Sequence, residues 1–123
     1  SNGYALANDD NGYPYTTLDL KSIQEQEIQK VKDWFDFVVT TPVQYTNGLW
    51  YEPEYSQQYY TLLQKYLDDN MTLTIWDVSG KPENAREMTK QELIELTKFL
   101  ADIYERAYQE KKSNLAKIKV ING

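Results

Sequence analysis

The sequence predicts an α+β fold in which three helices pack with two short antiparallel β-hairpins in a single domain, with a long C-terminal helix as its backbone. Three observations support this prediction. Apolar residues recur at helical spacing in three segments. Short β-prone runs lie in pairs between those segments. Neither pair leaves room for the crossover connection that parallel strands require, so antiparallel hairpins are favoured over a parallel sheet.

The composition fits one globular domain with a modest core. The chain has 123 residues, of which 41% are hydrophobic and 14% are aromatic, with 11 tyrosines. Tyrosine covers a small core while its hydroxyl stays hydrated, so this composition suits a thin domain or a contact surface. No apolar run approaches the roughly 18 residues that a membrane span needs.

The charge and the missing residue types exclude several functions. The formal net charge is −6, which disfavours nucleic acid and anionic membrane as partners. The sequence has neither Cys nor His, and this excludes the usual zinc sites, Ser-His-Asp triads and Cys-His pairs. We expect no metal site and no cofactor.

Residues 1–16 are interpreted as an extended N-terminal arm or linker that precedes a single α+β domain at 17–121. Asn, Asp, Gly and Tyr dominate this arm, and no helical period is present. Asp9, Asn11 and Gly12 match part of a calcium-binding loop, but both end positions of that loop carry apolar residues. A plain polar turn is therefore favoured.

The first helix is predicted at 19–39. It ends before Thr41-Pro42, because proline disfavours helical geometry in the residue that precedes it. Its apolar residues fall on one side of a helical wheel. They are Leu20, Ile23, Val31, Trp34, Phe35 and Val38.

A β-hairpin is predicted at 43–51. Asn47-Gly48 separates two short β-prone runs there, and both residues tolerate a positive φ. Ser56 is then expected to cap a second helix at about 57–68. The residues expected on the buried side of that helix are Tyr59, Leu62, Leu63, Tyr66 and Leu67.

A second hairpin is predicted from the alternation in 71–77. Met71, Leu73 and Ile75 share one face of this strand, and Thr72, Thr74 and Trp76 share the other. A turn follows, and 85–88 is expected to return as a short partner strand.

The last helix, predicted at 89–119, is the element against which the others are expected to close. Thr89 and Glu92 have the spacing of a capping box, in which each side chain satisfies an unpaired backbone amide of the other residue. One apolar stripe follows the helix. It consists of Leu93, Leu96, Leu100, Ile103, Tyr104, Ala107, Leu115 and Ile118.

Two polar residues, Lys111 and Asn114, fall within this stripe. Either the helix leaves the core there and its last turns are solvated, or these turns pack against another subunit. Polar residues inside a helical seam are known to fix register and oligomer number. The candidate residues for self-association are Tyr108, Lys111, Asn114, Leu115 and Ile118.

Aromatic residues are densest between Trp50 and Trp76. One interpretation is a platform that binds a sugar or a peptide, and the other is a lid that fills space over the core. Trp50 and Trp76 favour the platform, because each alternates away from the aliphatic face of its strand. The candidate ligand- or partner-binding residues are Trp50, Tyr51, Tyr55 and Trp76.

Only carboxylate pairs remain for acid–base chemistry, and a hydrolase is the third hypothesis. Glu52 and Glu54 flank a proline at the exit of a hairpin, and Asp68 and Asp69 lie at a helix end. Such positions are typical of solvated termination signals, whereas a glycosidase needs two carboxyls facing each other across a cleft. We predict that the protein is not an enzyme and has no catalytic residues.

Five short motifs follow one another along the chain. They are QYTNGLWY at 44–51, EYS at 54–56, LTIWD at 73–77, MTKQEL at 88–93 and KSNLAKI at 112–118. Their order and spacing resemble an uncharacterised domain family found in tail, tail-fibre and tail-associated proteins of tailed bacteriophages and prophages. Thr41-Pro42 departs from the basic run that is more usual there, and the closing motif has one extra residue.

The resemblance implies a location rather than a chemistry, because the family has no agreed activity and no catalytic residues. It implies a virion tail, or the bacterial cytoplasm before assembly. The expected partners are other tail proteins or a host-surface component, with a homo-oligomer as a further expectation. The first hypothesis is thus a non-enzymatic structural or interaction module, and the alternative is a carbohydrate- or peptide-binding domain with an exposed Trp/Tyr platform.

Overall fold

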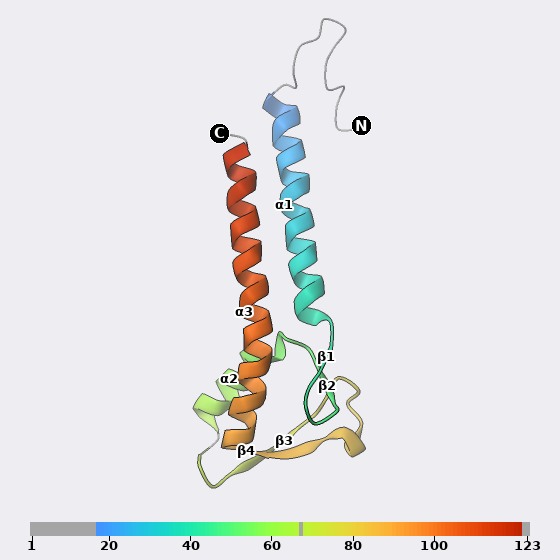
Figure 1. Ribbon diagram of the computed structural model, residues 1–123, viewed down its shortest axis with the longest axis vertical. Helices are drawn as coiled ribbons and strands as arrows, with labels where there is room; N and C mark the ends of the chain where they lie inside the picture. Colours follow the sequence, from blue (N-terminus) through green and yellow to red (C-terminus); the bar gives the residue numbers. More distant parts are fainter. Residues whose placement is uncertain (1–16, 67, 122–123) are drawn as a thin grey trace, which may run out of the picture. The chain divides into compact units, whose positions relative to one another are not determined.

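The computed structural model describes residues 17–66 and 68–121. It confirms an α+β fold with three α-helices, two antiparallel hairpins and a long C-terminal helix (Figure 1). The elements in order are α1 (Thr17–Thr40), β1 (Val43–Gln44), β2 (Trp50–Tyr51), α2 (Tyr55–Lys65), β3 (Thr72–Ile75), the 3-10 helix η1 (Pro82–Asn84), β4 (Arg86–Thr89) and α3 (Lys90–Ile121). The arm expected at residues 1–16 lies outside the described residues, so the division of the chain into an arm and a domain stays a prediction.

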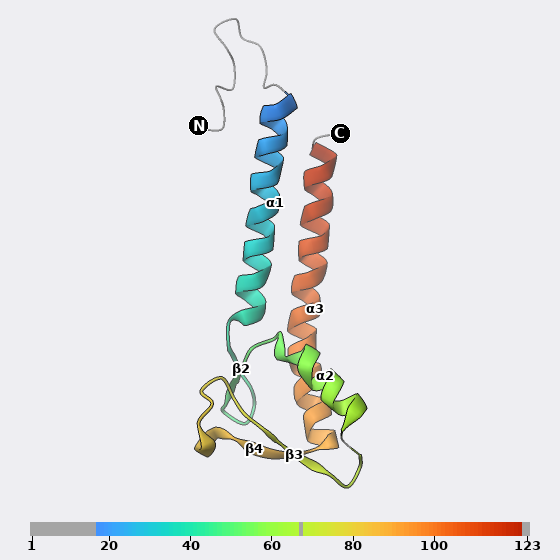
Figure 2. The ribbon, with the colours of Figure 1, turned by 180° about the vertical axis from the view of Figure 1, so that it is seen from behind.

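The chain divides into two compact units, which are described separately. Unit 1 contains the part of α1 up to Phe35 and the part of α3 from Gln109 onward. These two helical segments lie side by side in both views (Figures 1 and 2). Unit 2 runs from Asp36 to Tyr108 and contains both hairpins, α2 and the first half of α3.

The start of α3 has the predicted capping box. The Glu92 amide donates to Thr89 Oγ1 at 3.2 Å, and the Thr89 amide donates to Glu92 Oε1 at 2.9 Å. Each side chain thus satisfies a backbone group that the helix itself leaves unpaired. Thr89 is also the last residue of β4, so the strand passes directly into the helix.

The core of unit 2 is built on the first turns of α3. Leu93, Leu96 and Leu100 are completely buried, as the apolar stripe predicted. They form one cluster with residues of β2, α2, β3 and β4. The other buried members of that cluster are Leu49, Tyr51, Tyr59, Ile75 and Met88.

The first hairpin forms where it was predicted. β1 and β2 pair with Gln44 opposite Trp50, and only Gly48 has a positive φ, of 87°. The Gly48 amide donates to the Tyr45 carbonyl, and the Tyr45 amide donates to the Leu49 carbonyl. These bonds match a three-residue loop in which glycine alone takes the left-handed conformation. Of the two residues that tolerate a positive φ, Gly48 alone adopts one here.

The second hairpin pairs β3 with β4 in an antiparallel register, with Leu73 opposite Met88. Ile75 is buried and Leu73 is half-buried, as the alternation predicted. Met71 is 42% exposed instead, because it precedes the first paired residue of the strand. On the outer face, the hydroxyls of Thr72 and Thr74 donate to the Glu87 carboxylate.

The helix α2 begins at Tyr55, so the prediction that Ser56 caps it was wrong. Glu54 occupies the cap position without a capping side-chain bond, and Ser56 lies inside the first turn with 2% exposure. The helix also ends early, at Lys65. Tyr66 consequently leaves the buried side and is 57% exposed, while Leu67 lies outside the described residues.

Candidate functional site

The four aromatic candidates fall into two groups. Trp50 is 45% exposed and Trp76 is 46% exposed, as their alternation predicted, and Tyr55 is half-buried. Tyr51 is completely buried, so its assignment to a binding surface was wrong. In a strand, neighbouring side chains point to opposite faces, and an exposed Trp50 therefore requires an inward Tyr51.

The buried Tyr51 instead anchors the first hairpin. Its hydroxyl accepts a hydrogen bond from Asn47 Nδ2 at 3.1 Å, and its ring meets Tyr45 edge-on at a centroid distance of 6.3 Å. Burial raises the pKa of the Tyr51 hydroxyl, and the Asn47 bond opposes this rise. Tyr51 is thus a core residue whose polar end is satisfied from the turn.

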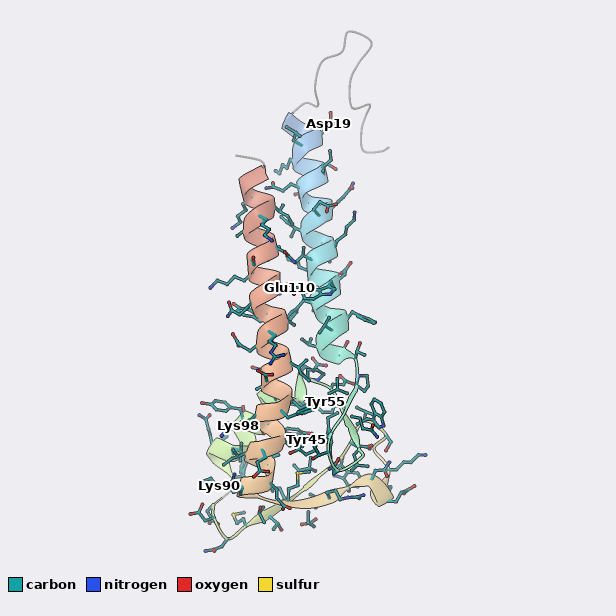
Figure 3. All side chains as sticks on the ribbon, viewed as in Figure 1. Asp19, Tyr45, Tyr55, Lys90, Lys98 and Glu110 are labelled. Atoms are coloured by element: carbon teal, nitrogen blue, oxygen red, sulfur yellow. The ribbon has the colours of Figure 1, made fainter. Side chains whose placement is uncertain are left out.

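A surface groove lies between one face of α2 and the end of β3, and we call it the α2–β3 groove. Its volume is about 410 Å³. It is lined by Tyr55, Gln58, Tyr59, Leu62, Thr74, Ile75, Trp76 and Asp77. Trp76 and Tyr55 thus belong to one surface feature, whereas Trp50 does not line it. Tyr55 is labelled among the side chains of unit 2 in Figure 3.

Gln58 and Leu62 also line the groove, although neither was predicted as a binding residue. Both follow Tyr55 at helical spacing, three and seven residues later, and therefore share its face of α2. The 3.6-residue period was a signal for them. The helical period does not predict that this face of α2 lies beside β3, because that proximity depends on tertiary packing.

Three carboxylates lie close to the Tyr55 end of the groove. Burial raises the pKa of the Tyr55 hydroxyl, and the negative charges of Glu52, Glu54 and Asp77 raise it further. Burial also raises the pKa of the Glu52 carboxyl, and the neighbouring Glu54 carboxylate adds to that rise. This end of the groove therefore has a negative potential.

Asp77 organises the turn after β3. Burial opposes its ionisation, but hydrogen bonds from the Ser79 hydroxyl and from the amides of Ser79, Trp50 and Gly80 outweigh this and lower the pKa of its carboxyl. The Val78 amide also donates to the Trp50 carbonyl at 3.0 Å. The end of β3 is thereby fixed to β2, and Trp76 is held on a rigid backbone.

The self-association candidates occupy different environments. In unit 1, Lys111 Nζ lies 4.4 Å from the centre of the Phe35 ring, a cation–π contact with α1 of the same chain. Asn114, Leu115 and Ile118 are half-buried, and Tyr108, in unit 2, is 43% exposed. Lys111 thus lies in the apolar stripe because α1 covers it, and self-association itself stays a prediction.

The carboxylate pairs lie outside the α2–β3 groove. Neither Glu52 nor Glu54 lines the α2–β3 groove, and Asp68 and Asp69 are exposed. Within residues 17–66 and 68–121, no group of three acidic side chains is arranged to hold a metal ion. The expectation of a protein without catalytic activity stays a prediction.

Comparisons with protein-family models, curated proteins and solved structures gave no match. The resemblance to phage-tail domains therefore rests on the order of the five motifs alone. Among the helices that the structure describes, none is long and apolar enough to cross a membrane.

Proposed function

We propose that this chain is a non-enzymatic structural and interaction module of a phage or prophage tail or tail-fibre-associated protein. Its partners are other tail proteins or a host-surface component. The motif order supports the location, and the paired helical segments of unit 1 support a role in assembly. The proposal depends chiefly on the paired helical segments of unit 1.

The seam of unit 1 has the spacing of an assembling helix pair. Half-buried or buried residues follow one another at intervals of three and four, and two of those on α3 are polar. The seam residues are Ile28, Val31 and Phe35 on α1, and Lys111, Asn114 and Ile118 on α3. A polar residue in such a seam costs stability and is a known device for fixing register and oligomer number.

The start of α1, before the first seam residue, has apolar side chains that are not covered. Leu20 and Ile23 on α1 remain 43% and 38% exposed. A single pair of helical segments buries little apolar surface, and further helices from a second copy supply the missing cover. These observations support a homo-oligomer that forms through unit 1.

Sedimentation equilibrium of the full chain tests this assembly role. We expect reversible self-association that the double variant Leu20→Ser/Ile23→Ser weakens at least about tenfold, because two partly buried aliphatic side chains are lost. Phe37→Ser is the matched control, since Phe37 is 67% exposed on α1 but belongs to unit 2. A wild-type chain that stays monomeric at high micromolar concentration contradicts the assembly role.

The location has a separate test. In a strain that carries the gene, prophage induction and purification of particles allow immunogold labelling with antibodies against the chain. Label on tails supports the proposal. Purified particles without the protein, alongside normal expression in the cell, contradict it.

A second function is proposed for the aromatic surface of unit 2: binding of a carbohydrate or a peptide. Trp50 and Trp76 are each exposed over almost half of their surface, and this favours a binding function. Large, rigid rings give broad contact at low entropic cost. Of the four predicted residues, Trp76 and Tyr55 contribute to one groove, and Tyr51 takes no part.

A further inference from the structure

The strand β3 has an open edge in the part of the chain that the structure describes. β4 pairs along one side, from Thr72 opposite Thr89 to Ile75 opposite Arg86. No other described strand joins this two-stranded sheet. The free stretch ends near Asp77, because the next amide, of Val78, donates to the Trp50 carbonyl. An open edge presents a row of backbone N–H and C=O groups that an extended chain can pair with.

The α2–β3 groove lies directly beside this edge. One of its walls consists of the consecutive residues 74–77, and the other wall is the face of α2 that carries Tyr55 and Leu62. Trp76 is 46% exposed, whereas Tyr59 and Ile75 are buried, with exposures of 6% and 3%. A pocket for a side chain therefore lies next to backbone groups that no other described strand pairs with, which is the arrangement used in strand addition.

The charge of the groove selects the kind of side chain. Asp77 itself lines the groove, and Glu52 and Glu54 lie close to Tyr55, another lining residue, whose pKa their charges raise. A negative potential therefore reaches the groove. Among the described residues, none of these three acids takes part in an ion pair. Aromatic faces beside carboxylates favour a cation, because the ring quadrupole and the negative charges attract it together.

We propose that the α2–β3 groove binds an extended peptide segment of another protein, which pairs with the open edge of β3 and places a Lys or Arg side chain against Trp76. This inference rests on the second proposed function and names its ligand. The peptide backbone supplies hydrogen bonds to β3, and the basic side chain supplies selectivity. A sugar ring would stack on Trp76 but would use neither the strand edge nor the acidic end of the groove.

The first experiment is a selection from a random dodecapeptide library displayed on yeast, with the full chain as target. Binders of the Trp76→Ala variant are removed by counter-selection. We expect an enriched pattern that combines β-prone residues with Lys or Arg. A library that yields no Trp76-dependent peptide, or one in which acidic residues are enriched, overturns the proposal.

The second experiment measures the affinity of an enriched peptide by NMR titration and fluorescence anisotropy. We expect amide shifts concentrated in Thr72–Ile75 and at Trp76. The Trp76→Ala variant should bind about tenfold or more weakly, as the loss of a desolvated cation–π contact implies. Trp50→Ala is the matched control, because Trp50 is equally exposed but does not line the groove.

The role of the negative charge near the groove is tested with the double variant Glu52→Gln/Glu54→Gln. The control is Glu83→Gln, because Glu83 is an exposed acid on η1. We expect the double variant to lower the affinity and to reduce its salt dependence, whereas Glu83→Gln changes neither. Equal effects of the two changes contradict the charge argument.

A parallel titration with linear and branched oligosaccharides separates the inference from the function on which it rests. Sugar binding that depends on Trp76, without a selected peptide, overturns the peptide inference and leaves the binding function in place. If neither ligand class depends on Trp76, the inference and the binding function are both refuted. All variants are first compared with the wild type by circular dichroism, so that unfolding is not mistaken for lost binding.

Discussion

The Ser56→Ala variant should stabilise the protein. Ser56 is 2% exposed, and its Oγ has no hydrogen-bond partner among the described residues. A buried hydroxyl without a partner has lost its hydration and gained nothing in return, which costs about 1–3 kcal/mol. Thr97, also buried in a helix, differs because its hydroxyl donates to the Leu93 carbonyl at 2.6 Å.

Two smaller effects accompany the change. Removing one oxygen leaves a void of roughly 12 Å³, which costs about 0.3 kcal/mol at 24 cal/mol per Å³. Alanine also has a helix propensity about 0.5 kcal/mol better than serine. Ser113→Ala measures this propensity alone, because Ser113 is an exposed residue of α3. The net gain of Ser56→Ala over Ser113→Ala should therefore be about 1–2 kcal/mol.

Urea unfolding followed by circular dichroism measures this difference. With a slope of about 2 kcal/mol per M, the midpoint of Ser56→Ala should lie about 0.5–1 M above that of Ser113→Ala. Equal slopes are needed for the comparison, since a changed slope indicates a changed unfolded or native state. If Ser56→Ala is less stable than Ser113→Ala, the hydroxyl has a bonding partner and the reasoning is refuted.

Three further predictions concern the capping box, the buried Asp77 and the half-buried Glu52. Thr89→Ala and Glu92→Ala should each lower the free energy of unfolding by about 1 kcal/mol, and the double variant by less than the sum; Gln91→Ala in the same turn is the control. The lowered pKa of Asp77 contributes stability above its ordinary value of 3.8, and this stability is lost as the pH falls through the folded value. Asp77→Asn should therefore destabilise at pH 7, and its effect should shrink as the pH falls below 3.8. The raised pKa of Glu52 has the opposite effect on stability. Above pH 4.5 the unfolded chain carries an ionised Glu52, whereas the folded protein disfavours that ionised form. Glu52→Gln should therefore stabilise the protein at pH 7 but not at pH 3. Urea midpoints at each pH test both signs, and an effect independent of pH contradicts the electrostatic cause.

Features coded by neighbouring residues were predictable from the sequence. The Thr89–Glu92 capping box depends on a three-residue spacing, and both of its bonds form as predicted. The inward Leu73 and Ile75 and the outward Trp50 and Trp76 follow from strand alternation. In each case the physical cause lies within one turn of helix or one short strand.

Features that depend on tertiary packing were not predictable in this way. Ser56 has the composition of a helix cap, but α2 begins one residue before it and the serine lies buried. Lys111 was predicted to be solvated or to contact another subunit. The sequence spacing alone does not show that Phe35 of the same chain lies opposite it. The α2–β3 groove was not predicted for the same reason, since its two walls come from separate elements, α2 and the end of β3, that only tertiary packing brings together.

The turn at Asn47-Gly48 also bears on how the protein ages. Asn-Gly pairs deamidate readily, because the glycine amide attacks the asparagine side chain and releases ammonia. Here the Asn47 oxygen accepts the Leu49 amide, its nitrogen donates to the Tyr51 hydroxyl, and the Gly48 amide is held by the Tyr45 carbonyl. In the intact hairpin both reacting groups are engaged in these hydrogen bonds. Deamidation of Asn47 therefore requires the hairpin to open, and the deamidated fraction of the protein reflects how often it has opened.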